Sequence, residues 1–260
     1  MTSNVALSRF FEYTQSLVTA CTDHISIVGL VLVGSTAETE RVDEWSDHDF
    51  FVITKSGEQE SLRNDLSWLP NAQSIAFSFR ETEHGLKVVY ESGAVLEFAV
   101  FDCTELRACS INHNRLVYGG SDVAEALNVA RRRLPSVGSS DDLRDFRLFL
   151  SLILIGVGRA RRGEILAAGQ HIRTHAGSAL MKLLTHHLPS NNQLDKLDVW
   201  RRFEFVHPEV GNKLANALAQ QPEAAAMALL KIAENALAAI WSGYPHEDVR
   251  VVKRTLAWTE

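Results

Sequence analysis

The stretch from Leu30 to Ile53 constrains the fold most, because it places two carboxylates at the start of an apolar strand. An apolar run, Leu-Val-Leu-Val, leads into Gly34 and Ser35, and a polar loop then leads into Asp-His-Asp-Phe-Phe-Val-Ile. Side chains alternate across a strand, so Asp47 and Asp49 share one face. Their Cα atoms are expected about 7 Å apart, because each residue adds roughly 3.3 Å. Oxygens of both can then bind one hard cation such as Mg²⁺.

Neither half of this stretch is specific alone. Solvated aspartates also begin strands, and Gly-Ser is a common turn. Together they are more specific, because Gly34 lets the backbone approach a ligand closely, and the hydroxyl and amides of Ser35 can hold phosphate oxygens. The joint pattern predicts a phosphate turn beside a carboxylate pair.

Glu97 is a third candidate, because it interrupts the apolar run from Val95 to Phe101. An isolated glutamate among buried strand residues is costly unless it is paired or bound to a metal. A salt bridge to Lys87 across the predicted hairpin is one explanation. The other is that this strand lies beside the Asp47 strand, which would make Glu97 the third member of a carboxylate cluster.

The secondary-structure signals change character along the chain. Apolar periodicity predicts a first helix over 4–22, and strands are predicted at 25–33, 47–54, 74–80, 86–90 and 95–101. No strand signal of comparable strength follows Asp102, and helices are predicted over 122–134, from an N-cap within 139–142 to about 161, and over 164–188, 191–203, 209–220, 223–240 and 247–258. The predicted class is α+β: a small mixed-sheet domain over residues 1–115, then a helical bundle over 116–260.

Composition excludes several functions. With 26 Lys and Arg against 32 Asp and Glu, the net charge of −6 argues against a nucleic-acid partner. Three cysteines without metal or redox spacing predict free thiols in a reducing cytoplasm. The longest apolar run, Leu148 to Val157, is too short to span a bilayer, so no membrane association is predicted.

Two histidine pairs lie in the helical half. His171 and His175 are four residues apart on a predicted helix, and His186 and His187 are adjacent. No glutamate-based zinc pattern accompanies them, so they are interpreted as surface or packing histidines.

The combination of Gly34, Ser35, Asp47, Asp49 and Glu97 resembles the nucleotidyltransferase superfamily of the DNA polymerase beta type. That signature is an apolar strand, Gly-Ser or Gly-Gly, a loop, Asp-x-Asp or Asp-x-Glu, and a later acidic residue on a neighbouring strand. Among its branches the chain looks most like the antibiotic-modifying lincosamide nucleotidyltransferases, and more distantly like aminoglycoside adenylyltransferases. The motif residues cover less than a fifth of the chain.

The resemblance implies an enzyme that moves AMP or another NMP from ATP or another NTP to a hydroxyl of a small antibiotic-like acceptor, releasing pyrophosphate. It implies nucleotide binding by Gly34, Ser35, Asp47 and Asp49, and an acceptor pocket to which the helical bundle over 116–260 contributes. Two Mg²⁺ ions would be held by Asp47, Asp49 and Glu97, with Glu97 as metal ligand, base or both. A homodimer is a further expectation. The alternatives are a protein AMP-transferase and a non-catalytic nucleotide-binding or partner-binding module.

One position departs from the signature. His48 stands where the family usually has an apolar residue, which is interpreted as an exposed outer face of the strand.

Overall fold

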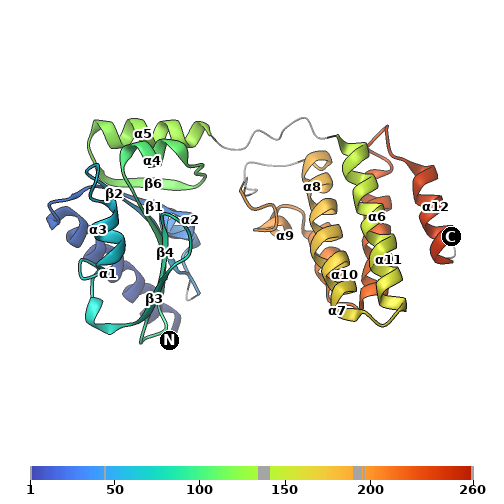
Figure 1. Cartoon of the computed structure of the whole chain (residues 1–260), viewed down its shortest axis with the longest axis horizontal. Helices are drawn as coiled ribbons and strands as arrows, with labels where there is room; N and C mark the ends of the chain where they lie inside the picture. Colours follow the sequence, from blue (N-terminus) through green and yellow to red (C-terminus); the bar gives the residue numbers. More distant parts are fainter. Residues whose placement is uncertain (1, 44, 134–140, 190–194, 196, 259–260) are drawn as a thin grey trace. The chain divides into compact units, whose positions relative to one another are not determined.

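The structure, a computed structural model, describes residues 2–43, 45–133, 141–189, 195 and 197–258. The chain forms two compact units, Met1–Ser136 and Val137–Glu260 (Figure 1). The first contains a mixed sheet and the second is helical, which confirms the predicted α+β class. No helix within the described ranges is both long and apolar enough to cross a membrane.

Six strands form the sheet of the first unit. They are β1 (Ile27–Val33), β2 (His48–Thr54), β3 (Ile75–Arg80), β4 (Gly85–Tyr90), β5 (Val95–Phe101) and β6 (Asn114–Gly119). Their order is β3-β4-β5-β2-β1-β6. Strands β2 and β5 run parallel, and the other neighbours are antiparallel. The parallel pair lies at the centre of the sheet, and it positions the carboxylates.

Helices cover both faces of this sheet. The helices and short turns of the first unit are α1 (Thr2–Asp23), α2 (Gly34–Ala37), η1 (Thr39–Arg41), α3 (Gln59–Asn64), η2 (Ala72–Ser74), α4 (Cys103–Ala108) and α5 (Ser121–Arg132). Leu17 and Cys21 of α1 join Phe50 and Phe98 in one buried cluster. The other face packs against α4 and α5 through a second cluster that includes Ile53. Because strand side chains alternate, one apolar strand supplies both cores.

Strand β6 and helix α5 belong to the first unit, although the predicted domain boundary lies at residue 115. The prediction that no strand follows Asp102 is wrong for β6. This strand pairs with β1 at the edge of the sheet, and Leu116 and Tyr118 are only half-buried. A short edge strand needs no long apolar run, so its sequence signal is weak.

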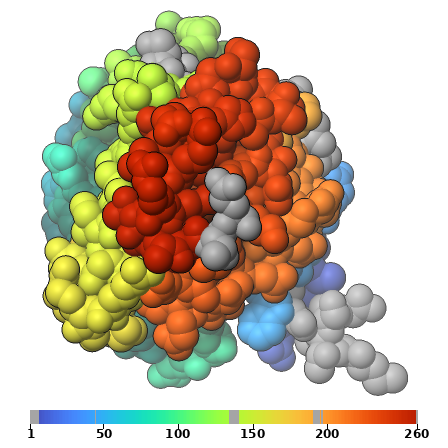
Figure 2. Space-filling model, turned by 90° about the vertical axis from the view of Figure 1, so that its right-hand side faces the viewer, coloured from blue at the N-terminus to red at the C-terminus, as the bar shows by residue number. Residues whose placement is uncertain are grey.

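The second unit is built from helices. They are α6 (Asp142–Arg161), α7 (Ile165–Gly169), the π-helical segment η3 (Gln170–Ala176), α8 (Gly177–His187), α9 (Phe203–Val206), α10 (Pro208–Leu218), α11 (Pro222–Leu237) and α12 (His246–Leu256). Helix α12, red in Figure 2, covers part of one face of the unit and packs on α6. Of the helix predicted over 191–203, residues 191–194 and 196 lie outside the described ranges, and residues 197–202 form turns and bends.

Candidate functional site

The pairing of β2 with β5 brings the three predicted carboxylates together. Asp49 lies opposite Glu97 in the parallel register, and Asp47 directly precedes β2. One carboxylate oxygen from each of the three residues lies within 4.8 Å of the others. Asp47 and Asp49 are half-buried, whereas Glu97 is exposed. The cluster is therefore anchored on one side and open to a ligand on the other.

Gly34 lies against this cluster and closes β1. Its φ of +57° is in the left-handed region, and a Cβ atom built on it would be 2.7 Å from Oδ2 of Asp49. Only glycine combines that backbone conformation with so close a carboxylate. The amide of Gly34 donates to the carbonyl of His113, 3.1 Å away, and Ser35 is half-buried beside it. The Gly-Ser turn and the carboxylates thus form one site.

Thr36 is a positioning residue that the sequence analysis missed. It is 2 % exposed, and its hydroxyl joins the turn to the start of β2. The amide of Asp49 donates to Thr36 Oγ1 over 3.0 Å, and this hydroxyl donates to the carbonyl of Asp47 over 3.3 Å. Both backbone contacts flank the carboxylates, so Thr36 fixes their spacing. A threonine directly after Gly-Ser was the available signal.

Lys87 also contacts the cluster. In the β4–β5 hairpin it lies opposite Glu97, and its Nζ is 3.4 Å from Glu97 Oε2 and 2.9 Å from Glu81 Oε1. The hydrogen bond that Lys87 donates to Glu81, followed by the charge of Glu97, raises the pKa of Lys87. Both explanations for Glu97 therefore hold in the structure: it pairs with a lysine, and it faces the two aspartates.

His48 is buried, so the expectation of an exposed outer face is wrong. It is 5 % exposed, and its ring stacks on Phe10 of α1 with centroids 3.8 Å apart. Its Nε2 lies 3.1 Å from the Phe10 carbonyl and 3.2 Å from the Thr14 hydroxyl. Burial lowers the pKa of His48 to about 4, so the ring is neutral near pH 7. It faces away from the carboxylates, because neighbouring strand residues point to opposite faces.

The Glu38 carboxylate forms ion pairs on the loop after the Gly-Ser turn. The Glu38 carboxylate pairs with Arg41 and accepts from His113 Nδ1 at 2.8 Å. Burial alone would raise the pKa of Glu38, but the Arg41 hydrogen bond and the His113 charge outweigh it, so the pKa is lowered. Nε of Arg41 is buried and makes no hydrogen bond within the described part of the chain. These contacts hold the loop to the segment before β6.

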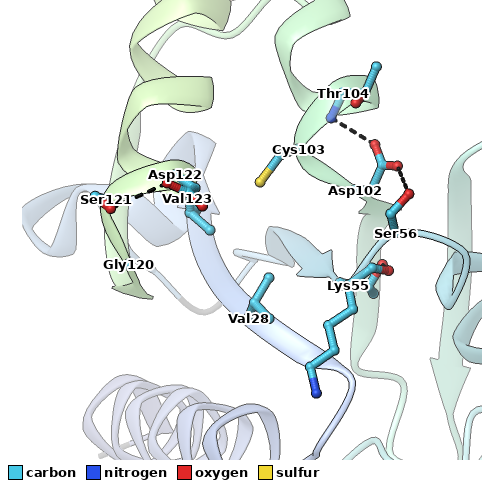
Figure 3. A pocket seen from close by; sticks show the side chains of 11 residues that line it. Val28, Lys55, Ser56, Asp102, Cys103, Thr104, Gly120, Ser121, Asp122 and Val123 are labelled. Atoms are coloured by element: carbon cyan, nitrogen blue, oxygen red, sulfur yellow. Dashed lines mark hydrogen bonds between the residues drawn. The ribbon is translucent and has the colours of Figure 1, made fainter.

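A separate pocket of about 320 Å³ lies at the other end of β2 (Figure 3). Thr54, Lys55 and Ser56 line it together with Cys103, and the N-terminal residues of α5 close one side. Of its two carboxylates, Asp102 accepts from Ser56 and from the amide of Thr104, and Asp122 accepts from the Ser121 hydroxyl. None of the predicted site residues lines this pocket, so it is not part of the carboxylate site.

The donor set of the carboxylate cluster fits a hard divalent cation. Three carboxylates offer only oxygen ligands, which Mg²⁺ prefers, and one exposed side leaves room for phosphate and water ligands. The formal charge of three close carboxylates also calls for a cation, because like charges at this separation repel.

No protein-family model matches the chain, and no curated protein sequence matches it. Among solved structures, the chain is similar to an aminoglycoside 6-adenyltransferase from Bacillus subtilis, at 12% identity and a TM-score of 0.33 over 95% of this chain and 91% of that one. A nucleotidyltransferase-like protein from Exiguobacterium sibiricum is 13% identical, with a TM-score of 0.34 over 86% and 74% of the two chains. A STING-associated c-di-GMP synthase from Capnocytophaga granulosa is 10% identical, with a TM-score of 0.33 over 98% and 83%. Similarity at this level describes no activity for this chain.

Proposed function

We propose that the protein is a Mg²⁺-dependent nucleotidyltransferase that moves an NMP group from an NTP, with ATP the first candidate, to a hydroxyl of a small acceptor. The observation that carries the proposal is the convergence of Asp47, Asp49 and Glu97, with oxygens within 4.8 Å of one another, beside the side-chain-free backbone of Gly34. Folding alone seldom requires three carboxylates to lie close together against a glycine turn.

Asp47, Asp49 and Glu97 would hold one or two Mg²⁺ ions, which neutralise phosphate charge when bound. The amide and hydroxyl of Ser35, beside the side-chain-free backbone of Gly34, would hold the terminal phosphates. The acceptor oxygen then forms a bond to the α-phosphorus while the bond to the pyrophosphate oxygen breaks. Glu97 would take the proton of the acceptor hydroxyl, and its exposure at the open side of the cluster supports this role.

The class of acceptor follows from the motif resemblance to antibiotic-modifying enzymes. A lincosamide or aminoglycoside hydroxyl is the acceptor to test first. Because a net charge describes the whole chain and not one pocket, the charge of −6 selects neither.

The test combines Mg²⁺, each α-labelled NTP and a panel of both antibiotic classes, and it follows labelled product and pyrophosphate. Asp47→Asn and Asp49→Asn should each lower turnover by about 10³-fold, because each removes a charge that balances the transferring phosphate. Glu91→Gln is the matched control, since Glu91 is exposed in the hairpin turn of the same sheet. It should stay within about twofold of the unmodified protein.

Two other results would replace the proposal. Label appearing on a protein instead of on the antibiotic would identify a protein AMP-transferase. Nucleotide binding without pyrophosphate release would identify a binding module. Equal turnover in Asp47→Asn and Glu91→Gln would show that the cluster is not catalytic.

A further inference from the structure

A second cluster of ligand-type side chains lies in the helical unit. Asp142 is the first residue of α6, and His186 and His187 are the last two residues of α8. One ligand atom from each lies within 4.8 Å of the others. His186 Nδ1 is 2.9 Å from Asp142 Oδ1, and His187 Nε2 is 3.1 Å from Asp142 Oδ2. The two oxygens of one carboxylate thus each face an imidazole nitrogen.

The His187 contact is not a hydrogen bond. Its Nε2 is buried and makes no hydrogen bond within the described residues, although the carboxylate oxygen is close. An imidazole nitrogen that carries no proton offers a lone pair to a cation. A cation bound to both Nε2 of His187 and Oδ2 of Asp142 would give this buried nitrogen a partner. The ring itself is held in place, because it stacks on Trp241 with centroids 4.9 Å apart.

The electrostatic field at the two helix ends favours the charges of these side chains. Positive charge is stabilised at the C-terminus of a helix, which is where His186 and His187 lie, and negative charge at the N-terminus, which is where Asp142 lies. The same two helices are already joined by an ion pair between Lys182 and the buried carboxylate of Asp145. The histidine cluster therefore belongs to a fixed helix pair and does not depend on a loop.

We propose that Asp142, His186 and His187 form a binding site for a borderline-soft divalent ion of the zinc class. Two imidazoles and one carboxylate are ligands that Zn²⁺ accepts readily, whereas Mg²⁺ prefers an all-oxygen set. The ion joins the first turn of α6 to the last turn of α8. This site is independent of the carboxylate cluster on the sheet.

The experiment titrates Zn²⁺ into the metal-free full chain by calorimetry, with Mg²⁺ at saturation to occupy the carboxylate cluster. One equivalent of Zn²⁺ should bind. Asp142→Asn and His187→Gln should each weaken binding by more than about 100-fold, because each removes a direct ligand, and even outer partners of metal ligands are worth 10–100-fold. His171→Gln is the matched control and should bind as the unmodified chain does, since His171 Nδ1 donates to the carbonyl of Ala167 and lies outside the cluster.

Co²⁺ provides a second readout that does not depend on stability. The unmodified chain should give visible absorption bands of Co²⁺ bound by nitrogen and oxygen, and Asp142→Asn, which preserves side-chain size, should lose them. A thiolate charge-transfer band would assign the ion to cysteines and overturn the proposal. Equal Zn²⁺ affinity in the unmodified chain and in Asp142→Asn would also overturn it, and would leave the cluster as an ion-pair contact between two helices.

Discussion

The two ligand clusters are alike in size and opposite in construction. Each brings three side chains within 4.8 Å, one on a sheet and one between two helix ends. The sheet cluster uses oxygen alone and takes its spacing from the register of β2 and β5. The helical cluster mixes nitrogen and oxygen and takes its spacing from the packing of α6 and α8. A backbone ladder fixes position residue by residue, whereas helix packing fixes it through many side chains at once.

Their chemistry differs accordingly. Three carboxylates favour a hard ion that also binds phosphate, while two imidazoles and one carboxylate favour a softer one. Changes that disturb the strand register or the Gly-Ser turn should therefore affect nucleotidyl transfer and leave Zn²⁺ binding as it is.

Among changes outside the three carboxylates, Gly34→Ala should have the largest effect. The new Cβ would be 2.7 Å from Asp49 Oδ2, so the carboxylate must move, and turnover should fall by about 100-fold. Gly57→Ala is the matched control, because Gly57 also has a positive φ, of +89°, with nothing within 4 Å of the new atom. Strain alone costs both variants about 1–2 kcal/mol.

Turnover and Zn²⁺ affinity are measured in parallel on both glycine variants. Only Gly34→Ala should lose activity, and both should keep Zn²⁺ binding. An equal loss of turnover in the two variants would mean that backbone strain, and not contact with Asp49, explains the effect.

Thr36→Val should have an intermediate effect. It leaves the part-buried amide of Asp49 without its acceptor, which costs about 1–3 kcal/mol of unfolding free energy. Turnover should fall by roughly tenfold, since the carboxylate spacing relaxes. Urea denaturation and initial rates measure the two quantities. Thr36→Ser should restore both, because the hydroxyl returns, and the exposed Thr39→Val should change neither. Failure of Thr36→Ser to restore activity would assign the role to the methyl group.

Lys87→Met should have the smallest effect and separates the two explanations for Glu97. Removing the lysine removes a positive charge 3.4 Å from the carboxylate, so the Mg²⁺ concentration at half-maximal rate should fall by about twofold to fivefold, as expected of an exposed ion pair. Glu97→Gln should instead raise that concentration and lower the maximal rate. If both variants lose activity equally, Glu97 acts mainly as the partner of Lys87.

Local patterns were enough to predict much of the sheet and the members of its cluster. Alternation identified the strands around Asp49 and Glu97. A charged residue within an apolar strand can be recognised from the sequence as a candidate site residue. Local sequence patterns do not show which strands pair when the strands are distant in sequence. The parallel register that sets Asp49 opposite Glu97, and the edge position of β6, depend on the whole sheet.

The errors have the same origin. His48 reads as an exposed polar residue, because the strand alone does not show that Phe10 of α1 covers it. Asp142 and His187 are 45 positions apart, and each is ordinary at its own helix end. Their meeting follows from tertiary packing, which single-sequence patterns do not encode.

The π-helical segment η3 has a consequence for everything after it. Seven residues, Gln170–Ala176, precede α8 directly, and π-type winding turns the chain through a smaller angle per residue than the about 100° of an α-helix. The segment therefore acts as a rotational offset between α7 and α8. The rotation of α8 about its own axis is therefore set by the preceding π-helical segment. That rotation determines the direction in which His186 and His187 point.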